Sequence, residues 1–242
     1  MHISPFSDRL APAGRSVIER FDDMDLSAAE FAALCDRHAV FADLLAKNGP
    51  TPAWRRPPTF ETVTRLVLEQ QVSLASANAA FNKLEDLNGP VSPETFLSLN
   101  DDELRSVGFS RQKSEYVRGV ADQILDGSLD LAAISLLDRH QAVAELVAIR
   151  GIGVWTASCF VLFVNGAPDV WPSGDRALYV SMTRVLDLSV VPTKEKCDEI
   201  ASEWAPHRSA AARMLWYDYL GGRTYVPKDR AGFTDSVGMV PS

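Results

Sequence analysis

Cysteine is scarce in this chain of 242 residues, which has only three, at positions 35, 159 and 197. Their spacing matches no disulfide or metal-binding framework, and an iron–sulfur cluster needs about four thiolates. Long apolar runs are absent too, because the longest, Cys159 to Val164, has six residues, whereas a membrane span needs about 20. The first twenty residues lack the continuous apolar stretch of a secretory signal. These absences predict a soluble, cytoplasmic protein.

A surplus of positive charge is also missing. The chain has 24 basic against 32 acidic side chains and a net charge of −8, which taken alone argues against a nucleic-acid partner. The charge is unevenly spread, since residues 1–149 carry a net −8 and residues 150–230 a net +1. The later region therefore still permits an anion site built from backbone amides, which needs no basic side chain.

Strand-like alternation is not evident either, and the pattern is helical almost throughout. Apolar residues from Thr59 to Leu87 recur at helical spacing and predict one long helix. The start signals are Ser27, Thr59, Ser92, Asn100, Ser110 and Thr193, and the stop signals are Gly89, Gly108, Gly127, Gly166 and Gly221-Gly222. We expect an all-α protein of about nine or ten helices of roughly 8 to 25 residues.

The boundaries of this fold are predicted from composition. Residues 1–223 are expected to form a single all-helical domain with its core at 28–223, and residues 224–242 a C-terminal tail. The segment from residue 1 to about residue 15 and the tail are rich in Pro, Gly, Ser and Asp and lack periodicity, so both are predicted to be extended arms.

Two glycines interrupt the predicted helices 141–149 and 154–165. The sequence Arg150-Gly151-Ile152-Gly153 leaves room only for a tight turn, and two residues without side chains allow another surface to approach the backbone closely. The amides that open the next helix would then face an incoming phosphate. The alternative is an ordinary interhelical turn, and this segment alone does not decide between the two.

Asp175 begins another apolar-periodic helix after the loop Asp169-Val170-Trp171-Pro172-Ser173-Gly174. Aspartate at this position is commonly an N-cap. The same carboxylate is suited to stabilise a developing cation or to orient a water molecule. The pattern leaves both roles open.

Several segments together resemble a known family. They are Leu68-Glu69-Gln70-Gln71-Val72-Ser73; Val107-Gly108-Phe109-Ser110 with Lys113; Ile149 to Ala157; Asp169-Val170-Trp171-Pro172 with Asp175; and Trp204 to Ser209 ahead of Trp216. In this order they resemble the helix-hairpin-helix DNA glycosylase superfamily, in particular its 3-methyladenine DNA glycosylase II branch. The resemblance covers about Ala28 to Arg223 and implies a two-lobed helical bundle, with the hairpin at about 141–165 and an active-site cleft between the lobes.

The resemblance also implies roles for individual residues. Asp175 would be the catalytic aspartate, and Gln71 would enter the gap left by a flipped nucleotide. The hairpin residues Gly151, Ile152, Gly153 and Thr156 would bind DNA. Relatives with lyase activity carry a lysine where this chain has Trp155, so no Schiff base with the sugar is expected and the product should be an abasic site.

Aromatic side chains suit a flipped, electron-poor base, because stacking contributes about 1 to 3 kcal/mol per base. Trp155 and Trp216 match family positions that face the base pocket. Trp54 and Trp171 are either further walls or core residues. Cys159 lies where some relatives have a pocket tyrosine, and a buried apolar filler is the alternative. Trp204 is interpreted as a core aromatic.

The resulting hypothesis is a monofunctional glycosylase that removes alkylated bases from duplex DNA in base excision repair. Its expected partner is duplex DNA with a damaged base, and it is expected to act as a monomer without a membrane partner, in the cytoplasm or at a bacterial nucleoid. No cofactor or metal is expected, although a monovalent cation at the hairpin of the DNA complex stays open. Two alternatives remain: a glycosylase for hypoxanthine, ethenoadenine or another damaged base, and a non-catalytic DNA-binding module.

Overall fold

The computed structural model describes residues 28–52 and 54–222, which form helices and connecting segments without a β-strand. The all-α prediction is confirmed for this part of the chain. In order, the helices are α2 (Ala28–Arg37), α3 (Ala39–Asn48), α4 (Phe60–Glu69), α5 (Leu74–Asn88), α6 (Pro93–Leu97), α7 (Asp101–Ser106), α8 (Arg111–Leu125), α9 (Leu131–Ser135), α10 (Arg139–Val147), α11 (Val154–Phe160), the π-helical segment η1 (Val161–Asn165), α12 (Arg176–Val185), α13 (Lys194–Ser202) and α14 (Arg208–Tyr219).

The expected number and length of helices were wrong. The described residues hold thirteen α-helices, and α6, α7 and α9 have only 5, 6 and 5 residues. Short helices escape a periodicity search because they present too few turns to display an apolar stripe. The predicted extended arms and tail, and the predicted cap at Ser27, lie outside the described residues.

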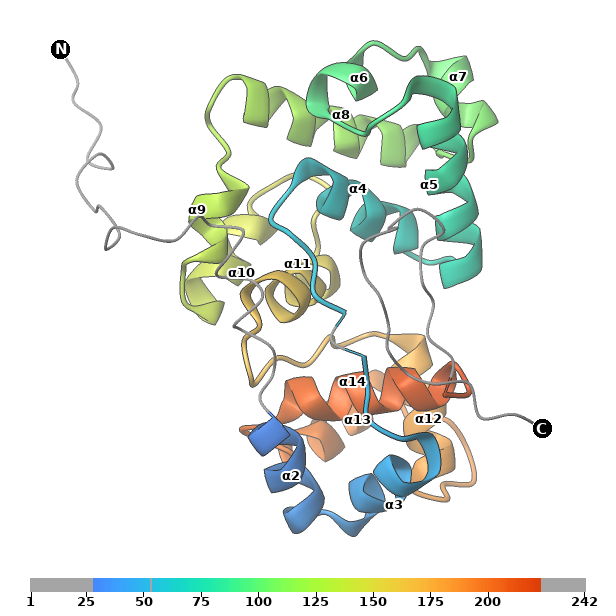
Figure 1. Cartoon of the computed structure of the whole chain (residues 1–242), viewed down its shortest axis with the longest axis vertical. Coiled ribbons are helices and arrows are strands. Elements are labelled where there is room, and N and C mark those ends of the chain that lie inside the picture. Colours follow the sequence, from blue (N-terminus) through green and yellow to red (C-terminus); the bar gives the residue numbers. More distant parts are fainter. Residues whose placement is uncertain (1–27, 53, 223–242) are drawn as a thin grey trace, which may run out of the picture.

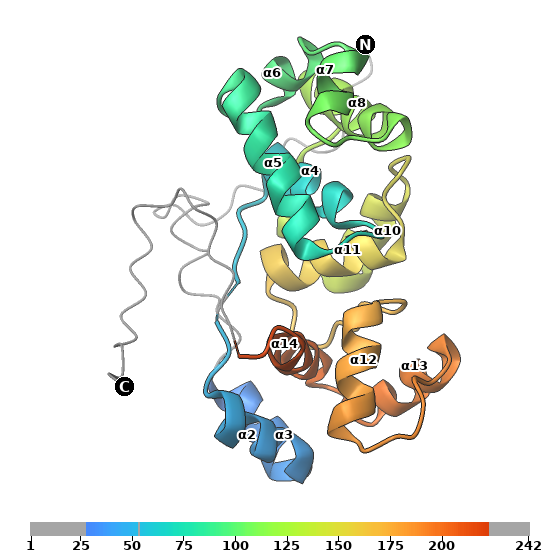
Figure 2. The same cartoon turned by 90° about the vertical axis from the view of Figure 1, so that its right-hand side faces the viewer.

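The helices form two groups (Figures 1 and 2). The upper group contains α4 to α11 with η1, and the lower group contains α2, α3, α12, α13 and α14. Helix α14 packs against α2, α3 and α12, so the beginning and end of the described chain share the lower lobe. Residues 49–52, 54–59 and 166–175 lie between the helices of the two lobes. The predicted two-lobed bundle is confirmed, and none of the helices described has the length and apolarity needed to cross a membrane.

Most helix ends lie where the sequence predicts them. The side chains of Thr59, Ser110 and Thr193 accept N–H bonds at the starts of α4, α8 and α13. Ser92 and Asn100 form capping boxes with residues three positions further on. The stop glycines all have positive φ: Gly89, Gly108, Gly127, Gly166, Gly221 and Gly222. Local capping chemistry therefore determines these boundaries.

The predicted long helix from Thr59 to Leu87 is wrong, because a turn at residues 70–73 divides it into α4 and α5. Gln71 has a left-handed backbone with φ 58°, and Ser73 starts the second helix by accepting the N–H of Ser76. Both helices bury their apolar faces in one core, so the apolar spacing continues across the break. Periodicity alone does not reveal such a turn.

Asp169 connects the two lobes. Its carboxylate accepts bonds from Arg208 on α14 at 2.6 and 2.8 Å and from Arg139 on α10 at 2.7 Å. Burial alone would raise the pKa of Asp169, but the hydrogen bonds from Arg208 and Arg139 outweigh it and hold this pKa well below its usual range. Ser209 adds a bond from its hydroxyl to the carbonyl of Ala167 at 2.6 Å. These contacts fix the segment that leads from η1 to α12.

Candidate active site

The hairpin between α10 and α11 has glycines with two different functions. Gly151 has φ 92°, and a Cβ atom there would lie 2.1 Å from the ring of Tyr116 on α8. Gly153 has an ordinary φ of −84° as the N-cap of α11, and a Cβ there would meet nothing within 4 Å. Ile152 between them is 4% exposed. The fold therefore requires Gly151, whereas Gly153 keeps an outer surface free of a side chain.

Asp175 is the N-cap of α12, as its position in the sequence suggests. Its Oδ1 accepts the backbone N–H of Leu178 at 3.0 Å. Its Oδ2 accepts the indole N–H of Trp155 at 2.9 Å. Because Trp155 is in α11 and Asp175 begins α12, this hydrogen bond joins the hairpin helix of the upper lobe to the lower lobe (Figure 1). The cap and candidate-catalyst interpretations are compatible, since different oxygens make the two bonds.

The loop before Asp175 is attached to α13. Asp198 accepts the indole N–H of Trp171 at 3.0 Å and the hydroxyl of Ser173 at 2.6 Å. Trp171 also packs edge-on against Trp204, with ring centroids 5.6 Å apart. Trp171 is thus held in the core of the lower lobe, which favours the core interpretation over a pocket wall. Trp204, 4% exposed, is the core aromatic that the sequence predicts.

A second cluster of aromatic and charged groups connects α4, η1 and α14. Trp216 stacks on Phe163, with centroids 5.4 Å apart and an interplanar angle of 28°. The Arg56 guanidinium lies 5.0 Å from the centroid of Phe163 and donates two bonds to Glu69, at 2.8 and 3.3 Å. Trp216 is half-buried, as a wall residue would be. Phe163, Arg56 and Glu69 have no assigned role in the sequence-based prediction.

Cys159 is 1% exposed and lies within the influence of two carboxylates. Burial raises the pKa of its thiol well above the usual range, and the negative charges of Asp175 and Glu69 raise it further, against the opposing effect of Arg56. The thiol is therefore neutral at pH 7. These facts favour the buried-filler interpretation of Cys159.

Trp54 lies in the segment between α3 and α4. It has a left-handed backbone with φ 48° and packs edge-on against Tyr217, with centroids 6.3 Å apart. A tryptophan in this conformation is uncommon and persists only where surrounding contacts fix it. The contact with Tyr217 places Trp54 against α14. Its role as a pocket wall stays a prediction.

The turn at residues 70–73 is exposed at Gln71 and Val72. Four hydrogen bonds hold the carbonyl groups of Leu68 and Gln70 and the side chain of Gln70 beside it. The ammonium group of Lys113 donates to the carbonyls of Leu68 and Gln70 at 2.7 and 2.9 Å, and burial lowers the pKa of Lys113. The Gln70 side chain reaches Thr156, which is 2% exposed and therefore not at the surface where the sequence-based prediction places a DNA contact.

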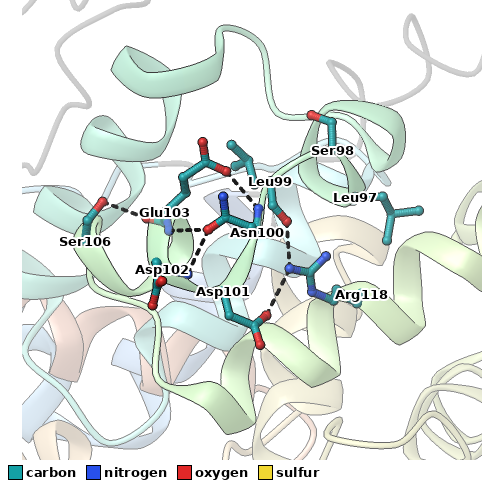
Figure 3. A pocket seen from close by; sticks show the side chains of 9 residues that line it. All are labelled: Leu97, Ser98, Leu99, Asn100, Asp101, Asp102, Glu103, Ser106 and Arg118. Atoms are coloured by element: carbon teal, nitrogen blue, oxygen red, sulfur yellow. Dashed lines mark hydrogen bonds and ion pairs between the residues drawn. The ribbon is translucent and has the colours of Figure 1, made fainter.

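The described residues also form a hollow of about 870 Å³ lined by α6, α7 and α8 (Figure 3). Three acidic residues of its wall, Asp101, Asp102 and Glu103, begin α7, and Arg118 bonds to Asp101 and to the carbonyl of Leu99. This hollow is in the part of the upper lobe remote from α12 (Figure 1). The cleft expected between the lobes stays a prediction.

Residues 64–207 match the family model described as HhH-GPD superfamily base excision DNA repair protein. The chain belongs to this superfamily. The matched region contains the 70–73 turn, the hairpin and Asp175. The resemblance stated from the sequence is therefore confirmed at the level of the family.

Individual relatives agree with this assignment. The chain is 27% identical over 177 residues to DNA-3-methyladenine glycosylase 1 of Schizosaccharomyces pombe, an alignment that covers 72% of this chain and 78% of that protein. It is 26% identical over 181 residues to Bacillus subtilis YfjP, covering 72% of this chain and 63% of YfjP, which is less than two thirds of that protein. The structure of S. pombe 3-methyladenine DNA glycosylase (Mag1) in complex with abasic DNA superimposes with a TM-score of 0.74 at 26% identity, covering 82% of this chain and 100% of that one.

Proposed function

We propose that this superfamily member is a monofunctional DNA glycosylase that hydrolyses the N-glycosidic bond of alkylated bases, of the 3-methyladenine and 7-methylguanine type, in duplex DNA. The observation that carries the proposal is the 2.9 Å bond from Trp155 to Asp175, which places a fixed carboxylate beside the hairpin helix. A module that only holds DNA requires neither group. The names of the relatives support the same class of substrate.

The carboxylate of Asp175 suits the chemistry of this reaction. Breaking an N-glycosidic bond develops oxocarbenium character on the sugar, and a carboxylate held by two donors needs little reorganisation to stabilise it. Asp175 is 9% exposed, so water screens its charge poorly. Alkylation at a ring nitrogen makes the departing base cationic and a good leaving group. A single carboxylate is then sufficient, without a dedicated general acid.

Trp155 determines the product in this proposal. An indole cannot form a Schiff base with the sugar, and its N–H is already used by Asp175. Release of the base should therefore leave an intact strand with an abasic site. The Trp155 ring also provides an aromatic surface for an electron-poor base, as does Trp216 stacked on Phe163.

DNA binding would use backbone amides at the hairpin more than basic side chains. Gly153 leaves the start of α11 open to a phosphate, and Gln71 is exposed on the neighbouring turn. We propose that the protein acts as a monomer on duplex DNA in the cytoplasm, without a cofactor. A monovalent cation at the hairpin of the DNA complex remains part of the hypothesis.

The test is a base-release screen with duplexes that contain 3-methyladenine, 7-methylguanine, hypoxanthine or ethenoadenine. We expect release of the two cationic methylpurines, with strand breaks that appear only after alkali. Preferential release of hypoxanthine or ethenoadenine would mean that the substrates are neutral lesions and not cationic methylpurines. Neutral lesions lack the built-in activation of the leaving group. Tight binding without release of any of the four bases would favour the non-catalytic module.

A further inference from the structure

Gln70 connects two elements that are separate in the sequence. Its side-chain amide, Nε2, donates to the carbonyl of Gly151 in the hairpin at 3.0 Å and to the hydroxyl of Thr156 in α11 at 3.0 Å. Both amide hydrogens are thus committed to the hairpin. The next residue, Gln71, is exposed and has φ 58°.

Residues of α8 contact both the 70–73 turn and the hairpin. Lys113 donates to the carbonyls of Leu68 and Gln70, at 2.7 and 2.9 Å. Tyr116, one turn further along α8, packs so closely against Gly151 that a Cβ at that glycine would lie 2.1 Å from its ring. The turn and the hairpin therefore rest on one helix and are joined directly to each other by Gln70.

This arrangement restricts how the turn can move. A left-handed backbone at a residue with a side chain persists only where the surrounding structure fixes it. Here the residue before Gln71 is held twice, because Lys113 binds the carbonyl of Gln70 and the side-chain amide of Gln70 binds the hairpin. A displacement of the hairpin backbone at Gly151 would therefore be transmitted to Gln71 through the side chain of Gln70. Contiguous hydrogen bonds of this kind are the physical basis for coupling between two sites.

We propose that Gln70 is a positioning residue that couples the phosphate-binding hairpin to the turn bearing Gln71, so that gripping the backbone also sets Gln71 for entry into the duplex. The inference rests on the proposed function for the nature of the DNA substrate. It assigns Gln70 to base extrusion and not to the chemical step. Lys113 is assigned the same positioning role, because its ammonium group holds the backbone carbonyl of Gln70.

The experiment compares Gln70→Leu with the wild type on two duplexes, one with the methylated purine paired normally and one with it in a mispair. Extrusion is least costly from a mispair. We expect single-turnover base release from the normal pair to fall about tenfold, the size expected for lost hydrogen bonds, and release from the mispair to fall less than about twofold. Gln123→Leu, a half-buried glutamine near the end of α8 and outside the hairpin, is the matched control and should behave as the wild type.

A double-mutant cycle with Gln71→Ala provides a second readout. If Gln70 acts through Gln71, then adding Gln70→Leu to Gln71→Ala should cost less than about twofold further. Equal losses on both duplexes, or fully additive effects of the two substitutions, would overturn the inference. Should Gln70→Leu not fold, Lys113→Met and Lys113→Arg replace it, and the arginine variant should recover much of the pair-selective loss because it retains donors for both carbonyls.

The inference and the proposed function can fail separately. Fluorescence of 2-aminopurine next to an abasic-site analogue reports insertion into the duplex without any bond cleavage. If the wild type releases no base, the proposed function fails, and the fluorescence change in Gln70→Leu still decides the inference. If the wild type releases methylpurines but the fluorescence response of Gln70→Leu equals that of the wild type, the coupling is wrong and the glycosylase assignment stands.

Discussion

The indole N–H of Trp155 donates to Oδ2 of Asp175 at 2.9 Å, while Oδ1 of the same carboxylate caps α12 through the N–H of Leu178 at 3.0 Å. The two oxygens thus bind groups from different lobes. One bond belongs to the helix that Asp175 begins, and the other fixes the carboxylate against the hairpin helix. The orientation of the candidate catalytic group therefore depends on how the lobes are packed.

Substitution of Asp175 by Asn separates its catalytic role from its capping role. Asparagine is as good an N-cap as aspartate, so the Tm of Asp175→Asn should remain within a few degrees of the wild type. Base release should fall on the order of 100-fold or more because the negative charge is lost. Binding to abasic-site DNA should be retained. Release of N-methylpurines at the wild-type rate would eliminate Asp175 as the catalytic carboxylate.

The Trp155 hydrogen bond can be removed without removing the aromatic ring. Trp155→Phe keeps a stacking surface but lacks the donor, and the loss of a bond to a charged group should lower the rate of base release about tenfold. Trp155→Ala should in addition reduce discrimination between methylated and normal purines. Thermal unfolding is the control: if Trp155→Ala unfolds at room temperature, the indole is mainly a core residue.

The two hairpin glycines form a matched pair of test positions. Gly151→Ala forces a positive φ on alanine and a clash with Tyr116, which should destabilise the protein by about 2 kcal/mol or more. Gly153→Ala meets no atom within 4 Å and keeps an ordinary φ, so it should destabilise the protein by no more than about 1 kcal/mol, the cost of alanine at an N-cap. Its affinity for DNA should nevertheless fall, because the new methyl group occupies the surface offered to phosphate. Chemical denaturation and fluorescence anisotropy measure the two effects, and unchanged affinity in Gly153→Ala would remove this surface from the DNA interface.

Stability should depend on pH through Asp169. Its pKa is lowered in the folded protein, so the stabilisation is present above the unfolded-state pKa of about 4 and is lost as the pH falls through the lower folded-state value. Asp169→Asn should cost about 2 to 4 kcal/mol at pH 7 because it leaves Arg139 and Arg208 without their carboxylate. Urea denaturation at pH 7 and pH 3.5 should give a smaller cost at the acidic pH. An equal cost at both pH values would contradict this role.

The charge distribution predicts a weak response to salt. A chain with a net charge of −8 that binds phosphates through backbone amides should release fewer than about eight counterions. The plot of log affinity against log salt concentration should therefore be shallower than about −7. Anisotropy titrations between low and moderate salt measure this slope. A steeper one would mean that many basic side chains contact the DNA backbone.

The sequence by itself determined the features that depend on neighbouring residues. Caps such as Asn100 and stop glycines such as Gly166 lie where they were predicted, since capping requires only a few adjacent groups. The order of short motifs also sufficed for the family, because each motif combines residue types at fixed spacing. The position of Asp175 at the start of α12 was likewise predicted from neighbouring residues.

The tertiary structure decided the features that depend on residues far apart in the chain. The break between α4 and α5 is stabilised by Lys113, more than forty positions away, and apolar spacing carries no information about such a donor. Gln70 meets Gly151 across 81 positions, and Arg56 pairs with Glu69 against Phe163 only because three elements converge. Trp171 illustrates the same limit, since its partner Asp198 belongs to a later helix. Helix ends follow from local hydrogen bonding, whereas the surroundings of the carboxylate follow from how two lobes pack.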